Sequence, residues 1–162
     1  MAIAYFSTWT TYGTWLPGDG RGWCSRGGIW QLPDTEILNT AQYRMTETAL
    51  VLDAIQRRIV EEAIAAHCGI RGWQLHAVNC RSNHVHVVVT AAGVPVDRPR
   101  EQFKYWGTRR LKEKTLDRKH WWADGGWDVY LDEEDHLERA IRYVIEGQDR
   151  GGEYASDAGA SG

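Results

Sequence analysis

The sequence predicts an α+β fold in which a mainly antiparallel sheet packs against helices. Strand-like segments rich in Thr, Val and aromatic residues alternate with segments of helical periodicity, in the order β-α-β-β-α-β-α. Only three residues separate the two central strand-like segments, which indicates a hairpin and therefore antiparallel pairing. The 162 residues suit one domain, which we place at residues 1–150, and the Gly-, Ala- and Ser-rich residues 151–162 predict a disordered tail.

The first half of the chain is predicted to contain one strand and one long helix. Residues 3–16 are rich in Thr and aromatic residues and predict a strand, and a Gly-, Trp- and Arg-rich loop follows to about Asn39. Residues 45–69 predict the helix, with Thr46 as its N-cap and Gly69 at its end. Its apolar residues recur at three- and four-residue steps: Leu52, Ile55, Ile59, Ala63 and Ala66.

The second half begins with the hairpin. Residues 73–80 and 84–91 predict its two strands. Pro99 suits the first turn of a second long helix, which is predicted to continue to about Lys114. Residues 120–131 predict one or two short strands around a Gly-Gly pair.

The last helix is predicted at residues 132–147. Its first residues are acidic, which the helix dipole favours at an N-terminus. Leu137, Ile141 and Val144 are spaced to face the core.

The composition predicts a cytoplasmic protein. No run of about 18 apolar residues is present, which predicts no membrane span, and the N-terminus lacks the basic start and apolar core of a signal peptide. Cys24, Cys68 and Cys80 are odd in number and form no C-x-x-C pair, which is typical of reduced thiols.

Charge and aromatic residues are unevenly placed. The net charge of −3 argues against a general nucleic-acid binder, yet residues 98–119 hold nine basic residues against three acidic ones. This segment is either a solvated helix face or a surface for phosphates. The nine tryptophans include more than a core needs, and aromatic rings beside cations suit single-stranded nucleic acid, although packing is the alternative for each ring. The candidate DNA contacts are Lys104, Trp106, Arg109, Arg110 and Lys112.

The stretch NHVHVVV at residues 83–89 places two histidines on a strand. Residues two apart on a strand point to the same face, so His84 and His86 project together, and the alternate valines line the other face. Two neighbouring imidazoles suit a divalent metal ion. The alternative is one exposed histidine and one that is hydrogen-bonded in the core.

Three segments together carry a family resemblance. They are FSTWTTYGTWLPGDGRGW at residues 6–23, NHVHVVV, and HWWADGGWDVYLDEEDHLERAIRYVIEG at residues 120–147, which contains Tyr143. In this order they resemble the HUH single-strand endonucleases, and within them the REP-associated branch of the single-tyrosine transposases. A lone tyrosine on a helix would be read as a packing residue, and the combination is what carries the signal.

The resemblance implies a ferredoxin-like (RRM-like) HUH endonuclease fold and a DNA transposase. It implies that His84 and His86 hold Mg²⁺ or Mn²⁺, which polarises the scissile phosphate of a single-stranded DNA next to a hairpin. Tyr143 is then the nucleophile, and its attack gives a 5′-phosphotyrosine linkage and a free 3′-OH. The covalent linkage conserves the phosphodiester energy for strand transfer.

The third metal ligand departs from the family pattern. Relatives usually carry Gln or Asn four residues after the nucleophile, where this chain has Gly147. Gln148 is the first candidate in its place, if Gly147 loosens the helix, and the carboxylate of Glu146 is the alternative.

Several alternatives stay open at this level. A domesticated relative would bind hairpin DNA without cutting it, and the altered position after Tyr143 favours that reading. A ferredoxin-like RNA-binding or metabolic domain would carry an incidental H-x-H pair. Replication initiators and relaxases share the chemistry in larger chains. The chain either forms a homodimer with active sites shared between protomers or works as a monomer, and its DNA partner would place it at the nucleoid.

Overall fold

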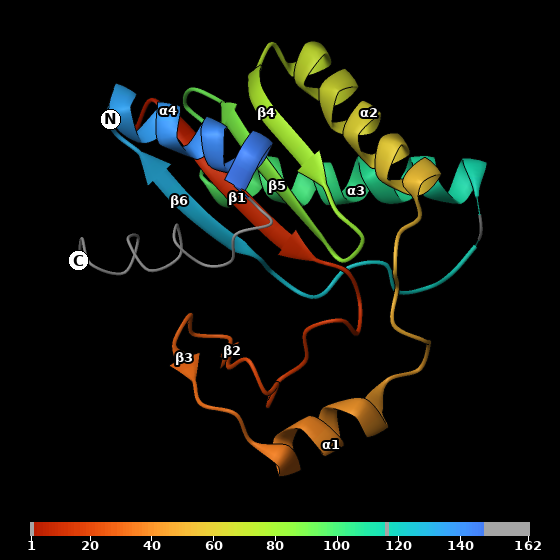
Figure 1. The fold of residues 1–162 in the computed structure, drawn as a ribbon. Helices are drawn as coiled ribbons and strands as arrows, with labels where there is room; N and C mark the ends of the chain where they lie inside the picture. Colours follow the sequence, from red (N-terminus) through yellow and green to blue (C-terminus); the bar gives the residue numbers. More distant parts are fainter. Residues whose placement is uncertain (1, 116, 148–162) are drawn as a thin grey trace.

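The computed structural model describes residues 2–115 and 117–147, and its centre is a four-stranded antiparallel sheet (Figure 1). The strand order is β4-β5-β1-β6. In chain order the strands are β1 (Ala4–Thr10), β4 (Gln74–Cys80), β5 (His84–Thr90) and β6 (Trp127–Leu131). With a helix between β1 and β4 and another between β5 and β6, this is the ferredoxin-like arrangement, which confirms the predicted fold class and the predicted hairpin.

Two long helices cover one face of the sheet. These are α2 (Ala54–Arg71) and α3 (Asp97–Lys114), which pack against each other and against the strands (Figure 1). The second helix confirms the prediction from Pro99. Val85, Val87 and Val89 of β5 are fully buried beneath the two helices, as the alternation in the sequence predicts.

A shorter helix covers part of the other face. It is α4 (Glu134–Arg142), which continues into the π-helical turn η1 (Tyr143–Gly147) and crosses in front of the sheet in Figure 1. Leu137 and Val144 are buried there and Ile141 packs beside them, as predicted. The π-helical turn is a departure from the regular helix that the sequence predicts.

The predicted helix at residues 45–69 is wrong at its start, and it ends at Arg71 with Gly72 as its C-cap instead of at Gly69. The helix α2 begins at Ala54, and its N-cap is Asp53 instead of Thr46. The Asp53 carboxylate accepts from the Gln56 amide N–H at 2.8 Å, and the Gln56 side chain accepts from the Asp53 N–H at 3.0 Å. This reciprocal pair satisfies two backbone donors that the first turn would otherwise leave open, so it fixes the start of the helix.

The segment between β1 and α2 contains structure that the sequence analysis missed. It holds a two-stranded ribbon, β2 (Trp23–Cys24) with β3 (Trp30–Gln31), and the helix α1 (Thr35–Arg44), all below the sheet in Figure 1. Asp34 caps α1, and no residue of this helix is buried. A helix without a buried face gives little apolar periodicity, which explains why it was predicted as a loop.

Two predictions concern residues outside the described part of the chain. They are the disordered tail at residues 151–162 and the role of Gln148. Among the described residues, no helix is both long and apolar enough to cross a membrane.

Candidate active site

The two histidines of the H-x-H motif lie on β5, on the sheet face that α4 partly covers. In the register of the sheet His86 lies between Thr8 of β1 and Asn79 of β4, and His84 lies opposite Thr10. Since neighbours across a sheet point to the same face, these polar side chains form one surface, opposite the face that packs on α2 and α3.

The two imidazoles lie against each other. Their ring centroids are 4.7 Å apart and the rings are nearly perpendicular. The Nδ1 of His84 lies 2.7 Å from the Oδ1 of Asn83, and this contact orients the ring. An imidazole whose Nδ1–H donates to such an oxygen can offer Nε2 to a metal ion.

His86 is the buried member of the pair. Its exposed fraction is 8%, and its ring stacks on Phe6 with centroids 5.6 Å apart. Burial, followed by the charges of His84 and Arg81, lowers the pKa of His86 to about 3, so the ring is neutral near pH 7. Within the described residues, its buried Nδ1 has no hydrogen-bond partner.

Tyr143 completes the cluster from the end of α4. Its ring meets His86 edge to face with centroids 5.7 Å apart, and it lies 6.0 Å from the ring of Phe6. Partial burial raises the pKa of Tyr143 above its usual value. The Asn79 side chain donates to the carbonyl oxygen of Val144 at 3.0 Å, which fastens this turn of the helix to β4.

Among the described residues, no His, Cys, Asp or Glu side chain is placed as a third metal ligand beside His84 and His86. Within residues 2–115 and 117–147, no group of three or more His, Cys, Asp or Glu side chains is placed to hold a metal ion. Glu146 is exposed, so the structure does not bring it to His84 and His86. Gln148 lies outside the described residues.

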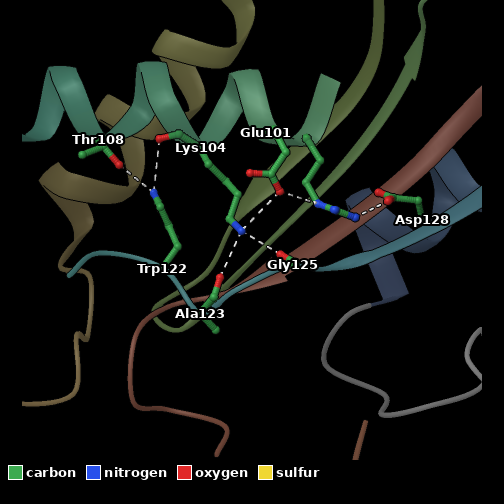
Figure 2. Close-up of polar contacts among 8 residues, drawn as sticks. Glu101, Lys104, Thr108, Trp122, Ala123, Gly125 and Asp128 are labelled. Atoms are coloured by element: carbon green, nitrogen blue, oxygen red, sulfur yellow. Dashed lines mark hydrogen bonds and ion pairs between the residues drawn. The ribbon is translucent and has the colours of Figure 1, made fainter. Parts of the chain in front are cut away.

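The structure places Lys104 inside the protein, in contrast to the predicted phosphate contact. Lys104 is 7% exposed, and its ammonium group donates to the carbonyl oxygens of Ala123 at 3.0 Å and Gly125 at 2.7 Å (Figure 2). The Glu101 carboxylate lies 3.6 Å away. Burial lowers the pKa of Lys104. The two carbonyl oxygens and the Glu101 carboxylate provide the polar partners that a buried ammonium group needs. Lys104 therefore stabilises the loop before β6.

The remaining predicted DNA contacts lie on α3, on the closed side of the sheet. Arg109, Arg110 and Lys112 are exposed. Trp106 is half-buried and stacks on His67, with centroids 5.8 Å apart, and the guanidinium of Arg109 lies 5.4 Å from its ring centroid. The structure therefore does not bring these residues together with His84, His86 and Tyr143, because the sheet lies between them.

The sequence analysis missed three residues that shape the cluster. Phe6 supports the rings of His86 and Tyr143, Asn79 holds the end of the helix, and Asn83 orients His84. Only Asn83 had a signal in the sequence, because it directly precedes the H-x-H pair. The other two come from strands whose register is visible only in the fold.

Comparisons with known proteins support the fold. The structure is similar to that of a REP-associated tyrosine transposase bound to a REP hairpin, with a TM-score of 0.53 and 14% sequence identity over 93% of this chain and 70% of that chain. No protein-family model and no curated protein matches the sequence. At this identity the likeness shows the ferredoxin-like fold, and the chemistry rests on the residues themselves.

Proposed function

We propose that the chain is a metal-dependent single-stranded DNA endonuclease and strand transferase, a transposase that acts at hairpin-associated sites in the cytoplasm. One observation carries the proposal: His84, His86 and Tyr143, from two separate elements, meet on the open side of the sheet. The fold is also that of a transposase solved with a DNA hairpin. A packing role alone does not require a phenol and a second imidazole that both contact His86.

The residues present fit a divalent cation such as Mg²⁺ or Mn²⁺. His86 is neutral and has a buried ring nitrogen without a partner among the described residues, and the Asn83 contact orients the ring of His84. An ion of this kind keeps several waters and takes substrate phosphate oxygens as further ligands, so a complete protein cage is not required. When bound, the ion would polarise the scissile phosphate and stabilise the charge that develops on it.

Tyr143 supplies the nucleophile in this proposal. Its hydroxyl oxygen forms a bond to the phosphorus while the bond to the 3′-oxygen breaks, which leaves a 5′-phosphotyrosine and a 3′-OH. Because burial raises the pKa of Tyr143, the hydroxyl is protonated in the free protein and loses its proton as the bond forms. Phe6 and His86 hold the ring from two sides and so limit the entropy that attack would cost.

The π-helical turn supports Gln148 as the third ligand over Glu146. A π-helix closes i→i+5 hydrogen bonds, so one turn takes up more residues than the 3.6 of an α-helix. On an ideal π-helix, the residue five positions after Tyr143 therefore falls nearer to one full turn than on an α-helix, while Gln148 itself lies outside the described residues. The same turn type is frequent at functional sites.

The contact between Tyr143 and His86 of one chain supports a monomer that acts in cis. A homodimer in which the tyrosine serves the partner's histidines is the alternative. Mixing a His86→Ala chain with a Tyr143→Phe chain separates them, because only a shared site would restore activity in the mixture.

A non-cleaving hairpin binder is the second candidate. The observation in its favour is the lack of a third His, Cys, Asp or Glu ligand among the described residues, together with Gly147 where relatives place a ligand. Such a protein would keep the DNA surface and lose the chemistry.

The test is incubation with hairpin-flanked single-stranded DNA and Mg²⁺ or Mn²⁺, read on a denaturing gel. We expect a covalent protein–DNA adduct that is lost with EDTA and lost in Tyr143→Phe. Metal-independent binding of the same DNA on a native gel, without any adduct, would instead identify the non-cleaving binder. Absence of both signals would contradict the proposal.

A further inference from the structure

Within residues 2–115 and 117–147, the face of the sheet that carries the candidate active site is covered only in part. The helix α4 packs over the end of the sheet that contains Ala4, Phe6 and Leu131. At the other end the side chains of Thr8 and Thr10 are partly exposed beside the histidines. A strip of polar sheet surface therefore runs from His84 and His86 across β1 to β6.

Trp127 stands at the far edge of this strip. It is the first residue of β6 and pairs with Thr8, which in turn pairs with His86, so all three point to the same face. Two strand spacings separate Trp127 from His86, which is roughly 10 Å. Its exposed fraction of 45% is large for a tryptophan on a sheet face, and burial in the core does not explain its position.

Four of the other tryptophans have structural roles. Trp9 and Trp121 are buried, and Trp122 donates to the Thr108 hydroxyl at 2.8 Å. Trp106 stacks on His67 on the opposite side of the sheet. Trp127 is therefore distinguished by both its exposure and its place beside the two histidines.

The loop before Trp127 is held in place from the closed side of the sheet. Lys104 of α3 binds the carbonyl oxygens of Ala123 and Gly125, and Arg100 pairs with Asp128, the residue after Trp127 (Figure 2). A side chain at Gly126 would come within 2.5 Å of the Arg100 side chain and 2.7 Å of the Thr8 carbonyl oxygen. These contacts fix the backbone on both sides of Trp127, so the ring is presented from a rigid support.

We propose that Trp127 is a base-stacking platform for single-stranded DNA, which holds a nucleotide next to the one whose phosphate Tyr143 attacks. The proposal rests on the proposed function and names the residue that receives the strand. A tryptophan face stacks on any base, because every base has a π-face, while the neighbouring threonine hydroxyls can donate to phosphate oxygens. Arg100 and Lys104 are positioning residues in this scheme.

The test measures binding without cleavage. A fluorescein-labelled single strand of about 20 nucleotides, longer than the ~4–16 nucleotides that such sites cover, is titrated in EDTA and followed by anisotropy. The duplex of the same sequence is the second probe. We expect Trp127→Ala to weaken single-strand binding by about 5- to 150-fold, Trp127→Phe to restore most of it, and duplex binding to change little. Trp30→Ala, at a 60% exposed ring on β3, is the matched control and should leave both affinities unchanged.

Three results would overturn the stacking role. They are equal single-strand affinity in wild type and Trp127→Ala, an equal loss for single strand and duplex, and a loss in Trp127→Phe as large as in Trp127→Ala. Circular dichroism of each variant shows whether a loss comes from unfolding. Failure of the proposed function has a different signature, because it removes the covalent adduct of the wild-type protein and leaves the anisotropy result intact.

Discussion

The two faces of the central sheet are built for different purposes from the same strands. On the face beneath α2 and α3, Val85, Val87 and Val89 are 0% exposed and belong to a closed apolar core. On the face beneath α4, the intervening residues include His84 and His86, and the described residues leave part of the surface open. One strand thus contributes to stability with every second residue and to the candidate site with the others.

The apolar packing of the closed face stabilises the sheet enough to tolerate polar residues on the open face. A polar pair such as two imidazoles on a sheet contributes little to folding, and burial of His86 disfavours its charged form. The apolar packing on the other side compensates, so the strand keeps its place without the help of its polar residues. The comparison predicts that changes on the open face alter chemistry more than stability, and that changes on the closed face do the reverse.

The largest expected effect is on the open face. Tyr143→Phe should reduce covalent adduct formation by about 10⁴-fold or more, since it removes the nucleophile. The free energy of unfolding should change little, because the ring still packs on Phe6 and His86. The measurements are a denaturing gel with a hairpin substrate and a urea titration. The control is Tyr105→Phe, at an exposed tyrosine of α3, which should keep full activity. An adduct in Tyr143→Phe would assign the nucleophile to another residue.

The closed face should give the largest effect on stability. Phe103 of α3 is 0% exposed and lies between Trp9, Trp73 and His67. Phe103→Ala should lower the free energy of unfolding by about 3–5 kcal/mol, from lost burial and the cavity that remains. Thr10→Ala, on the open half of the other face, should stay within about 0.5 kcal/mol. Equal losses in urea titrations of the two variants would remove the distinction between the faces.

The elements of the core were predictable because their signals are local. The hairpin follows from two apolar runs with three residues between them, and the burial of Val144 follows from helical spacing. The start of α2 was not predictable, because Leu50 and Leu52 are buried although they lie before the helix. The spacing of Leu52 continues the helical pattern by one more turn. The capping pair of Asp53 and Gln56 was the competing signal, and it determines the boundary.

The turn before β6 connects the two faces and should show an intermediate effect. Gly126→Ala places a methyl group within 2.5 Å of the Arg100 side chain and 2.7 Å of the Thr8 carbonyl oxygen. The Arg100 side chain can move, but the Thr8 oxygen belongs to the backbone of β1 and has little room to shift. We expect a loss of about 1–3 kcal/mol in the free energy of unfolding, together with weaker single-strand binding through displacement of Trp127. Gly20→Ala is the matched control, because a Cβ there meets nothing within 4 Å. A Gly126→Ala protein with wild-type stability and binding would show that the turn adjusts freely.

The candidate site was predictable only in part. The pairing of His84 with His86 follows from strand periodicity, but their contact with Tyr143 depends on how α4 lies across the sheet. The burial of Lys104 could not be foreseen, because a cation within a basic helix segment looks solvated until its acceptors, Ala123 and Gly125, are placed by the fold. The local sequence predicts which residues lie on the same helix or strand. Long-range packing determines which helices and strands come into contact.

The smallest expected effect concerns the exposed cations on the outer side of α3. Arg110 and Lys112 lie across the sheet from Tyr143, so we propose that they contact only phosphates of the hairpin stem. Each Ala substitution should weaken hairpin binding by about threefold and lower the slope of log affinity against log salt by about 1, with no effect on adduct formation at saturating DNA. Anisotropy titrations over a range of salt concentrations measure the slope. An unchanged slope in the double variant would identify these residues as a solvated helix face and would leave DNA binding to the open half of the sheet, which makes the contrast between the two faces complete.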